Sequence, residues 1–261
     1  MMALVLLMQV ALPQALLPWP FLLPAGTSGW VGLVVSGILL CFGVWFAARA
    51  VAGKTLSPVE MSDIANPFGS GHFLVAHGGS NTLLNSHLKT LVASVERFRP
   101  WHRQSCAVDF FGLGRWGLRA RGRRRADPRP MRSSAIFHAE VRAPCAGVVV
   151  AAEGGMPDFD VPNEDTVNRM GNHLILRCGN AEIVLAHMRQ GSIPLSPGDA
   201  VALGDRLGEV GNSGASTEPH LHIHAQRPAP ERAPPISGAP LALRIDGWFL
   251  VRGNLLDRVS G

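Results

Sequence analysis

Three histidines alternate near the carboxyl end of the chain: His220, His222 and His224 follow directly after a glycine-rich stretch at residues 211–216. In an extended strand, residues i and i+2 share a face, so the spacing predicts three imidazoles on one face and two aliphatic side chains on the other. Neutral imidazole is the commonest protein ligand for zinc, and a catalytic zinc site needs three protein ligands plus an open position for water. The segment is therefore a candidate metal-binding strand. The alternative is a polar strand face or an adventitious metal-binding tract.

The amino-terminal region contains two hydrophobic blocks. Residues 1–24 carry no charged side chain but include four prolines, whereas residues 30–51 are interrupted only by Ser36 as far as Arg49. About 20 apolar residues span a bilayer core, so the second block predicts a transmembrane helix and the first is a poorer candidate. The first block lacks the basic start of a secretory signal peptide. We therefore expect a retained membrane anchor over residues 1–54, with one or two hydrophobic segments.

The charges beside the anchor leave the membrane orientation open. Arg49 and Lys54 follow the second block, and the positive-inside tendency would place that side in the cytoplasm. Two charges are weak evidence. A single span with a cytoplasmic amino terminus places the following domain outside, and two spans do so only if the amino terminus is also outside.

Cysteines and arginines give less information about function. Cys41 lies in the membrane block, which leaves Cys106, Cys145 and Cys178 as an odd set, so we expect small buried residues and no disulfide framework. The formal net charge is +5, and eight arginines fall within residues 115–132. Interleaved glycine and proline predict a flexible insertion there, solvated or touching an anionic polymer or lipid head groups. We expect no nucleic-acid partner.

From Val141 onward, short β-rich runs alternate with turns. The runs at residues 147–151, 173–177 and 182–186 are separated by Gly, Pro, Asn and Asp, and no helix-period segment of useful length intervenes. This pattern predicts a mainly β domain, an antiparallel sheet or sandwich, behind the hydrophobic membrane segment. The long acidic loop at residues 153–170 is interpreted as functional or as disordered.

Six motifs occur in order along this part of the chain, at residues 143–150, 171–176, 185–188, 197–201, 208–214 and 219–222. Together they resemble the lysostaphin-type (LytM-like) zinc endopeptidases, which cut peptide cross-links in bacterial peptidoglycan. The resemblance implies a metallopeptidase domain at residues 71–254 that contains the arginine-rich insertion. Residues 55–70 would then be a linker and residues 255–261 a carboxyl-terminal tail.

The resemblance also implies roles for individual histidines. In that family an H-x-H strand supplies one catalytic histidine and one zinc ligand, which correspond here to His220 and His222. A separate histidine after a sheet strand corresponds to His187. Which of His187 and His220 acts as the base is left open. The glycine-rich turn at residues 211–216 would let a substrate backbone approach closely.

Two further zinc ligands are expected upstream. The chain lacks the usual H-x-x-x-D spacing but has Asn85-Ser-His87 and Gln104-Ser-Cys-Ala-Val-Asp109, which is similar to a membrane-associated branch of the family. The resemblance therefore implies His87 and Asp109 as ligands.

Several other positions are competitors or departures from the family pattern. His77 and His102 compete with His87 for the role of zinc ligand. The alternative for each is a loop histidine or a histidine that supports the ligands. Leu185 replaces the usual aromatic residue, no tyrosine is present, and His224 stands where Glu or Gln is frequent. His224 is interpreted as a partner of the ligands or as a solvent-facing residue. The remaining histidines, His72, His138 and His173, are interpreted as structural.

The resemblance implies a membrane-anchored, Zn²⁺-dependent endopeptidase that acts on peptidoglycan peptides outside the cytoplasm, in the periplasm. Two other functions stay open: a metal-poor, non-catalytic wall-binding regulator, and more remotely a biotinyl- or lipoyl-type carrier. A carrier needs an exposed lysine in a hairpin turn, and the segment after Lys89 offers none. The sequence does not indicate an oligomeric state.

Overall fold

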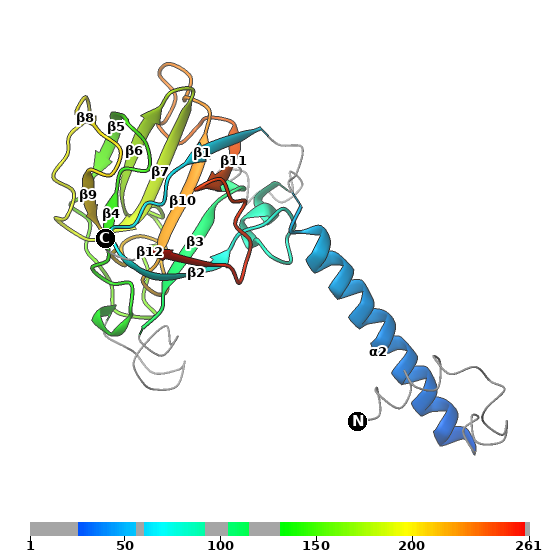
Figure 1. The fold of residues 1–261 in the computed structure, drawn as a ribbon. Coiled ribbons are helices and arrows are strands. Elements are labelled where there is room, and N and C mark those ends of the chain that lie inside the picture. The colour runs from blue at the N-terminus through cyan, green and yellow to red at the C-terminus, as the bar shows by residue number, and fades with distance from the viewer. Residues whose placement is uncertain (1–25, 56–59, 92–103, 115–130, 259–261) are drawn as a thin grey trace. The chain divides into compact units, whose positions relative to one another are not determined.

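The structure is a computed structural model that describes residues 26–55, 60–91, 104–114 and 131–258 (Figure 1). Three features of the sequence lie outside these residues: the first hydrophobic block, His102 and nearly all of the arginine-rich insertion. The chain divides into two compact units, residues 1–52 and residues 53–261.

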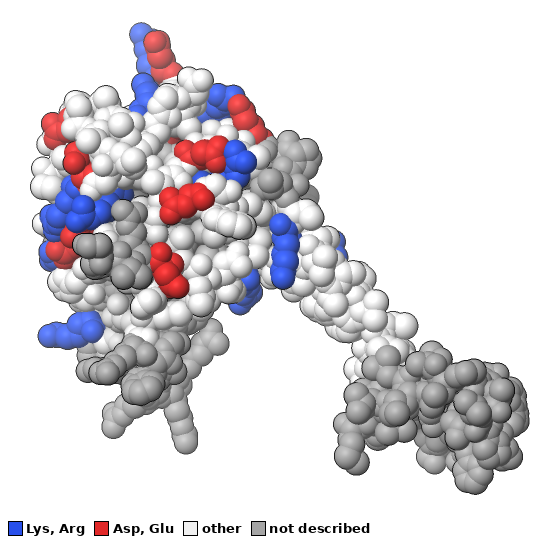
Figure 2. All heavy atoms as spheres, viewed as in Figure 1, with Lys and Arg blue, Asp and Glu red and all other residues white. Residues whose placement is uncertain are grey.

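The first unit contains one long apolar helix, α2 (Gly26–Ala52). At 1.5 Å per residue its 27 residues extend about 40 Å, more than the roughly 30 Å hydrocarbon core of a bilayer. Residues Trp30–Ala52 have a mean hydropathy of 2.3, and none of this apolar stretch is buried. Within the described residues this is the one helix long and apolar enough to cross a membrane. Its surface is almost free of charge in Figure 2, with the basic residue of its last turn at Arg49.

The second unit is built on a ten-stranded sheet. Its strands are β1 (Met61–Ile64), β2 (Gly71–His77), β3 (Val108–Gly112), β5 (Gly147–Glu153), β6 (Asn172–Cys178), β7 (Ala181–Met188), β8 (Ala200–Val201), β10 (Leu221–Gln226), β11 (Pro240–Ile245) and β12 (Leu255–Arg258). Eight strands follow the order β12-β2-β3-β10-β7-β6-β5-β8, while β11 pairs with β10 and β1 pairs with β11. A second sheet pairs β4 (Glu140–Arg142) with β9 (Arg206–Glu209).

This architecture confirms the predicted fold class. The chain is mainly β, and every strand pair is antiparallel except β1 with β11. The three runs predicted from Val141 onward appear as β5, β6 and β7. Strand β1 lies in the segment expected to be a linker, and β12 in the segment expected to be a tail. Both therefore contribute to the sheet.

The two faces of the central strands differ in chemistry. Leu221 and Ile223 of β10 and Leu185 of β7 point into the hydrophobic core, which the small sheet covers with Val141 of β4 and Leu207 of β9. Alternate residues on the same strands must then point to the opposite face. On β10 these are the histidines. The pleat thus separates an apolar face that stabilises the domain from a polar face that can do chemistry.

The expectation of no disulfide was wrong. Cys145 and Cys178 form a disulfide whose Cα atoms lie 6.0 Å apart. The bond joins the residues just before β5 and at the end of β6, where Val148 lies opposite Arg177. Antiparallel pairing brings the two cysteines together, which their sequence separation of 33 residues does not indicate. Of the described cysteines, Cys41 and Cys106 are free.

Candidate metal centre and hydrolytic site

Four neighbouring strands place the candidate residues in one row. Asp109 on β3 lies opposite His222 on β10, and His222 lies opposite Ala186 on β7. On the other side, His77 at the end of β2 lies opposite Asp109 after a register shift. Directly opposed residues have Cβ atoms about 4.5–5.5 Å apart, so sheet pairing alone brings these distant parts of the sequence together.

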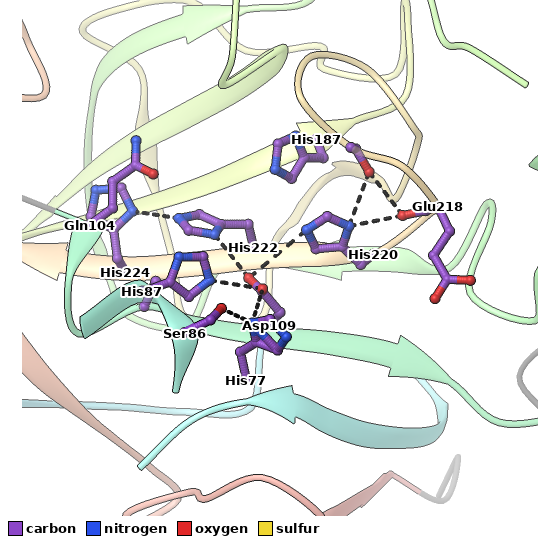
Figure 3. Close-up of polar contacts among 12 residues, drawn as sticks. His77, Ser86, His87, Gln104, Asp109, His187, Glu218, His220, His222 and His224 are labelled. Carbon is purple, nitrogen blue, oxygen red and sulfur yellow. Dashed lines mark hydrogen bonds and ion pairs between the residues drawn. The ribbon is translucent and has the colours of Figure 1, made fainter. Parts of the chain in front are cut away.

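Asp109 is the centre of the cluster. Its Oδ2 atom lies 2.8 Å from His87 Nε2, and its Oδ1 atom lies 2.9 Å from His222 Nδ1. Two more imidazoles stand slightly further away, with His77 Nδ1 3.6 Å from Oδ2 and His220 Nε2 3.9 Å from Oδ1 (Figure 3). Four imidazoles from three separate segments of the chain therefore surround the carboxylate.

The electrostatics of this cluster favour an ionised aspartate. Burial raises the pKa of Asp109, but the charge of His87 and the hydrogen bonds from His222 and His87 outweigh burial and hold that pKa well below its usual value. Burial lowers the pKa of His87, but the charge and hydrogen bond of Asp109 prevail and raise it overall. At neutral pH, Asp109 is thus an anionic oxygen donor.

His87 is positioned by Asn85 and the short 3-10 helix η3 (Ser86–Leu91). The buried Asn85 side chain donates a hydrogen bond to the Ala107 carbonyl at 2.9 Å, and its Oδ1 accepts one from the His87 backbone N–H at 3.1 Å. One amide therefore ties η3 to the residue just before β3. This explains how His87 meets Asp109 across 22 positions of sequence.

His77 ends strand β2 and lies in the cluster, as expected of a competing ligand or a supporting histidine and not of a loop histidine. Its ligand nitrogen and those of His87 and Asp109 all lie within 4.8 Å of one another. Burial is the main reason that the pKa of His77 falls to about 4, because it outweighs the opposing charge of Asp109. Ser86 Oγ lies 2.6 Å from His77 Nδ1. The nitrogen that faces Asp109 is therefore already engaged by a hydroxyl.

His224 is fully buried beside His222. Its Nδ1 atom lies 3.0 Å from His222 Nε2, while its own Nε2 atom has no hydrogen-bond partner among the described residues. Of the two alternatives for His224, the structure places it against the candidate ligand, away from solvent. When His222 Nδ1 offers its lone pair, Nε2 carries the proton and His224 Nδ1 can accept it. His224 is therefore placed to support the tautomer in which His222 Nδ1 can bind a metal.

His187 and His220 form a pair next to this row, with ring centroids 4.6 Å apart. Nδ1 of His187 lies 2.9 Å from the Ser213 carbonyl, and Nδ1 of His220 lies 2.9 Å from the Glu218 carbonyl. A carbonyl only accepts, so each Nδ1 carries the proton and each Nε2 of a neutral ring is free to accept another. Burial holds the pKa of His187 well below its usual value, which keeps the ring neutral.

The backbone at His187 adopts φ 61°, an uncommon conformation for a non-glycine residue. Two hydrogen bonds hold it: the His187 N–H donates to the Met170 carbonyl at 3.1 Å, and its carbonyl accepts from Gly211 N–H at 2.9 Å. Such conformations cost about 1–3 kcal/mol and persist where the surroundings enforce them. The end of β7 therefore turns the imidazole of His187 toward His220.

The glycine-rich turn has a different role from the one expected. A side chain at Gly211 would collide with Asp158 and Arg189, and one at Gly214, where φ is +75°, would collide with Arg169. These glycines allow the turn to pack against the acidic loop, so they serve protein contacts. Asp158 Oδ1 also accepts a hydrogen bond from the Asn212 N–H at 2.6 Å. The acidic loop thus supports the segment that carries the Ser213 carbonyl.

A polar cavity of about 410 Å³ opens onto the cluster. Asp109 and His220 line it together with His77 and Arg252. A smaller apolar cavity of about 120 Å³, lined in part by Leu88, contains no histidine or carboxylate. Of these two cavities, only the larger one is lined by residues of the histidine–aspartate cluster.

The donor set fits zinc. Two imidazole nitrogens and one carboxylate oxygen are ligands that Zn²⁺ accepts at catalytic sites, and three protein ligands leave a position for water. Two candidate groups of three zinc ligands share His87 and Asp109. They differ in whether His222 or His77 is the third ligand. Nδ1 of His222 contacts Asp109 alone within the described residues, whereas Nδ1 of His77 is already bonded to Ser86.

Comparison with known proteins gives one family match. The sequence profile "Peptidase family M23" matches residues 133–234. The matched part contains His187, His220 and His222 and begins after His87 and Asp109. No curated protein matches the chain.

Solved structures with some similarity include three peptidases. The catalytic domain of the antimicrobial peptidase lysostaphin from Staphylococcus simulans is 20% identical, with a TM-score of 0.32 over 52% of this chain and 74% of that one. A zinc-containing peptidase from Vibrio cholerae is 17% identical, with a TM-score of 0.27 over 46% of each chain. Pseudoalterin, an M23 metalloprotease from the deep sea, is 15% identical, with a TM-score of 0.40 over 76% of this chain and 99% of that one.

Proposed function

We propose that this chain, which belongs to peptidase family M23 through residues 133–234, is a zinc-dependent endopeptidase that cuts peptide cross-links of bacterial peptidoglycan. One observation carries the proposal. The β3–β10 register sets Asp109 opposite His222, and η3 adds His87 on the other carboxylate oxygen. Two of these residues lie outside the family match, so the geometry supports the site independently of the match.

His87, Asp109 and His222 would hold the zinc ion. A bound zinc ion lowers the pKa of its water toward neutrality and polarises a carbonyl oxygen. Asp109 supplies the anionic ligand, and two neutral imidazoles leave the site net positive. That charge favours the negative oxygen that develops on the scissile carbonyl during hydrolysis.

The pair of His187 and His220 moves the protons. Each ring has Nδ1 fixed as a donor to a carbonyl, so each Nε2 can accept a proton from the attacking water and return it to the leaving amine. Burial lowers the pKa of His187 and keeps its Nε2 unprotonated at neutral pH, so this nitrogen is available to accept a proton. His220 lies beside Asp109, on the wall of the cavity, and once its Nε2 is protonated it can donate a hydrogen bond to the developing oxyanion.

Placement outside the cytoplasm is part of the proposal. The apolar helix α2 supports membrane anchoring, and the Cys145–Cys178 disulfide supports an oxidising compartment, because such bonds are rare in the cytosol. A secreted substrate such as the cell wall is then within reach of the domain.

The test uses the full-length chain purified in detergent and incubated with isolated peptidoglycan. Zinc content and newly formed peptide ends, identified by mass spectrometry, are measured together. The proposal requires about one zinc per chain and new amino ends from cross-links, both lost in His222→Ala. A chain that binds zinc but releases no wall peptide would instead be a non-catalytic wall-binding regulator.

A further inference from the structure

Arg252 stands at the edge of the proposed active site, in the turn before β12. Its backbone N–H donates to the Gly78 carbonyl at 3.2 Å, and the N–H of Gly253 donates to the Val75 carbonyl at 2.9 Å. These bonds pin the turn to the end of β2, beside His77. The base of the Arg252 side chain is therefore fixed next to the cluster.

The Arg252 side chain is exposed and lines the same 410 Å³ cavity as Asp109 and His220. Among the described residues its guanidinium has no hydrogen bond or ion pair, whereas Arg189 and Arg244 are each paired with an acid. Of the described residues that line the cavity, Arg252 is the one arginine or lysine. An unpaired arginine that faces a substrate cavity is available to a ligand.

Neither of the acidic residues described in the lining of this cavity forms an ion pair with Arg252. Asp109 is bonded to His87 and His222, and it is one of the proposed metal ligands. The carboxylate of Glu218 points away from the histidines in Figure 3. The Arg252 guanidinium is therefore available to pair with an anionic group brought by the substrate.

Guanidinium chemistry favours carboxylates and phosphates, and of these a peptide cross-link supplies the carboxylate. The planar fork of arginine matches a carboxylate with two parallel hydrogen bonds, which lysine cannot reproduce. Leu74 and Phe111 add apolar surface to the same cavity, suited to the aliphatic stem of an amino acid. A volume of about 410 Å³ lies within the range of small-ligand sites, roughly 300–1,000 Å³. The carboxylate and the scissile amide would therefore occupy one compact site.

We infer that Arg252 is a specificity-determining residue that binds a free carboxylate close to the scissile amide of the cross-link. The inference rests on the proposed function and narrows its substrate. The preferred cross-link contains a residue whose carboxylate is left free. Neutral cross-links, including glycine bridges and amidated peptides, are poorer substrates.

Binding to the metal-free, full-length chain tests this inference without catalysis. Two synthetic cross-linked peptides are compared by calorimetric titration: one has a free carboxylate beside the amide, and the other has a carboxamide at that position. Hydrogen bonds to charged groups predict that wild type binds the acid at least about tenfold more tightly. In Arg252→Gln the two peptides should bind equally, with the affinity for the carboxamide unchanged. Arg206→Gln removes the same charge outside the cavity and should behave as wild type.

The same variants loaded with zinc are then assayed for cleavage of both peptides. The ratio of kcat/KM values should show the same preference in wild type and lose it in Arg252→Gln. A preference that survives in Arg252→Gln, or that is absent from wild type, would overturn the inference and leave the proposed function standing. A binding preference without any cleavage would contradict the proposed function and leave the role of Arg252 intact.

Discussion

Replacing His224 by leucine should weaken zinc binding while leaving the fold almost as stable as before. His224 Nδ1 lies 3.0 Å from His222 Nε2, and both residues are buried. Leucine keeps an apolar volume in this position but cannot accept the Nε2–H of His222. The ligand would then lose the contact that fixes its tautomer and its ring orientation.

The magnitudes follow from the hydrogen bonds on each side of His224. An unsatisfied buried polar group costs about 1–3 kcal/mol, and wild type already carries one at His224 Nε2. His224→Leu removes that group and creates another at His222 Nε2, so the two costs nearly cancel. The lost hydrogen bond adds about 0.5–1.5 kcal/mol. Loss of a hydrogen-bond partner behind a metal ligand typically lowers metal affinity about 10–100-fold.

Two measurements on the full-length chain test this balance. Zinc affinity is measured by competition with a chelator, and stability by urea unfolding of the metal-free protein. His224→Gln is the matched control, because its amide oxygen can accept from His222 Nε2 and should keep zinc affinity within a few-fold of wild type. Unchanged zinc affinity in His224→Leu would refute the positioning role. So would a stability loss well above about 3 kcal/mol.

Three further predictions concern the histidine pair, pH and the disulfide. His187→Ala and His220→Ala should each lower peptidoglycan hydrolysis by about 10²–10⁴-fold while zinc stays bound, and equal zinc loss in His220→Ala and His222→Ala would contradict this division. The folded chain holds His187 neutral, with its pKa well below 6.5, so its stabilisation is complete above about pH 6.5 and is lost as the pH falls below that value. The urea concentration at the unfolding midpoint of the metal-free chain should accordingly be lower at about pH 5.5 than at about pH 7.5. An equal decrease in His187→Gln would show that another group is responsible. Removing the disulfide with Cys145→Ser and Cys178→Ser should cost about 2–4 kcal/mol in urea unfolding under non-reducing conditions, and a loss below about 0.5 kcal/mol would show that the bond contributes little.

Local sequence patterns predicted the strands and the strand face on which the histidines lie. The alternation of His222 and His224 with aliphatic residues appears in β10, where those aliphatic residues join the core. Glycine and proline punctuation located β5, β6 and β7 to within about two residues. These features depend on neighbours in sequence, so a single chain contains the information.

Long-range pairing was less accessible to sequence reasoning. The contact of Asp109 with His222 spans 113 positions and depends on the β3–β10 register, which no local pattern encodes. The Cys145–Cys178 bond was missed for the same reason, because adjacent strands set it. Arg252 had no motif to mark it, and only the turn that pins it to β2 places it beside the cavity. Burial of His224 likewise depends on packing around β10.

The identity of the zinc ligands decides whether His87, Asp109 and His222 form a metal centre. Anomalous diffraction from crystals of the zinc-loaded, full-length chain would locate the ion. We predict one zinc about 2.0–2.2 Å from nitrogen atoms of His87 and His222 and from an oxygen of Asp109. An ion bound by His77 in place of His222, or the absence of zinc from this cluster, would contradict it.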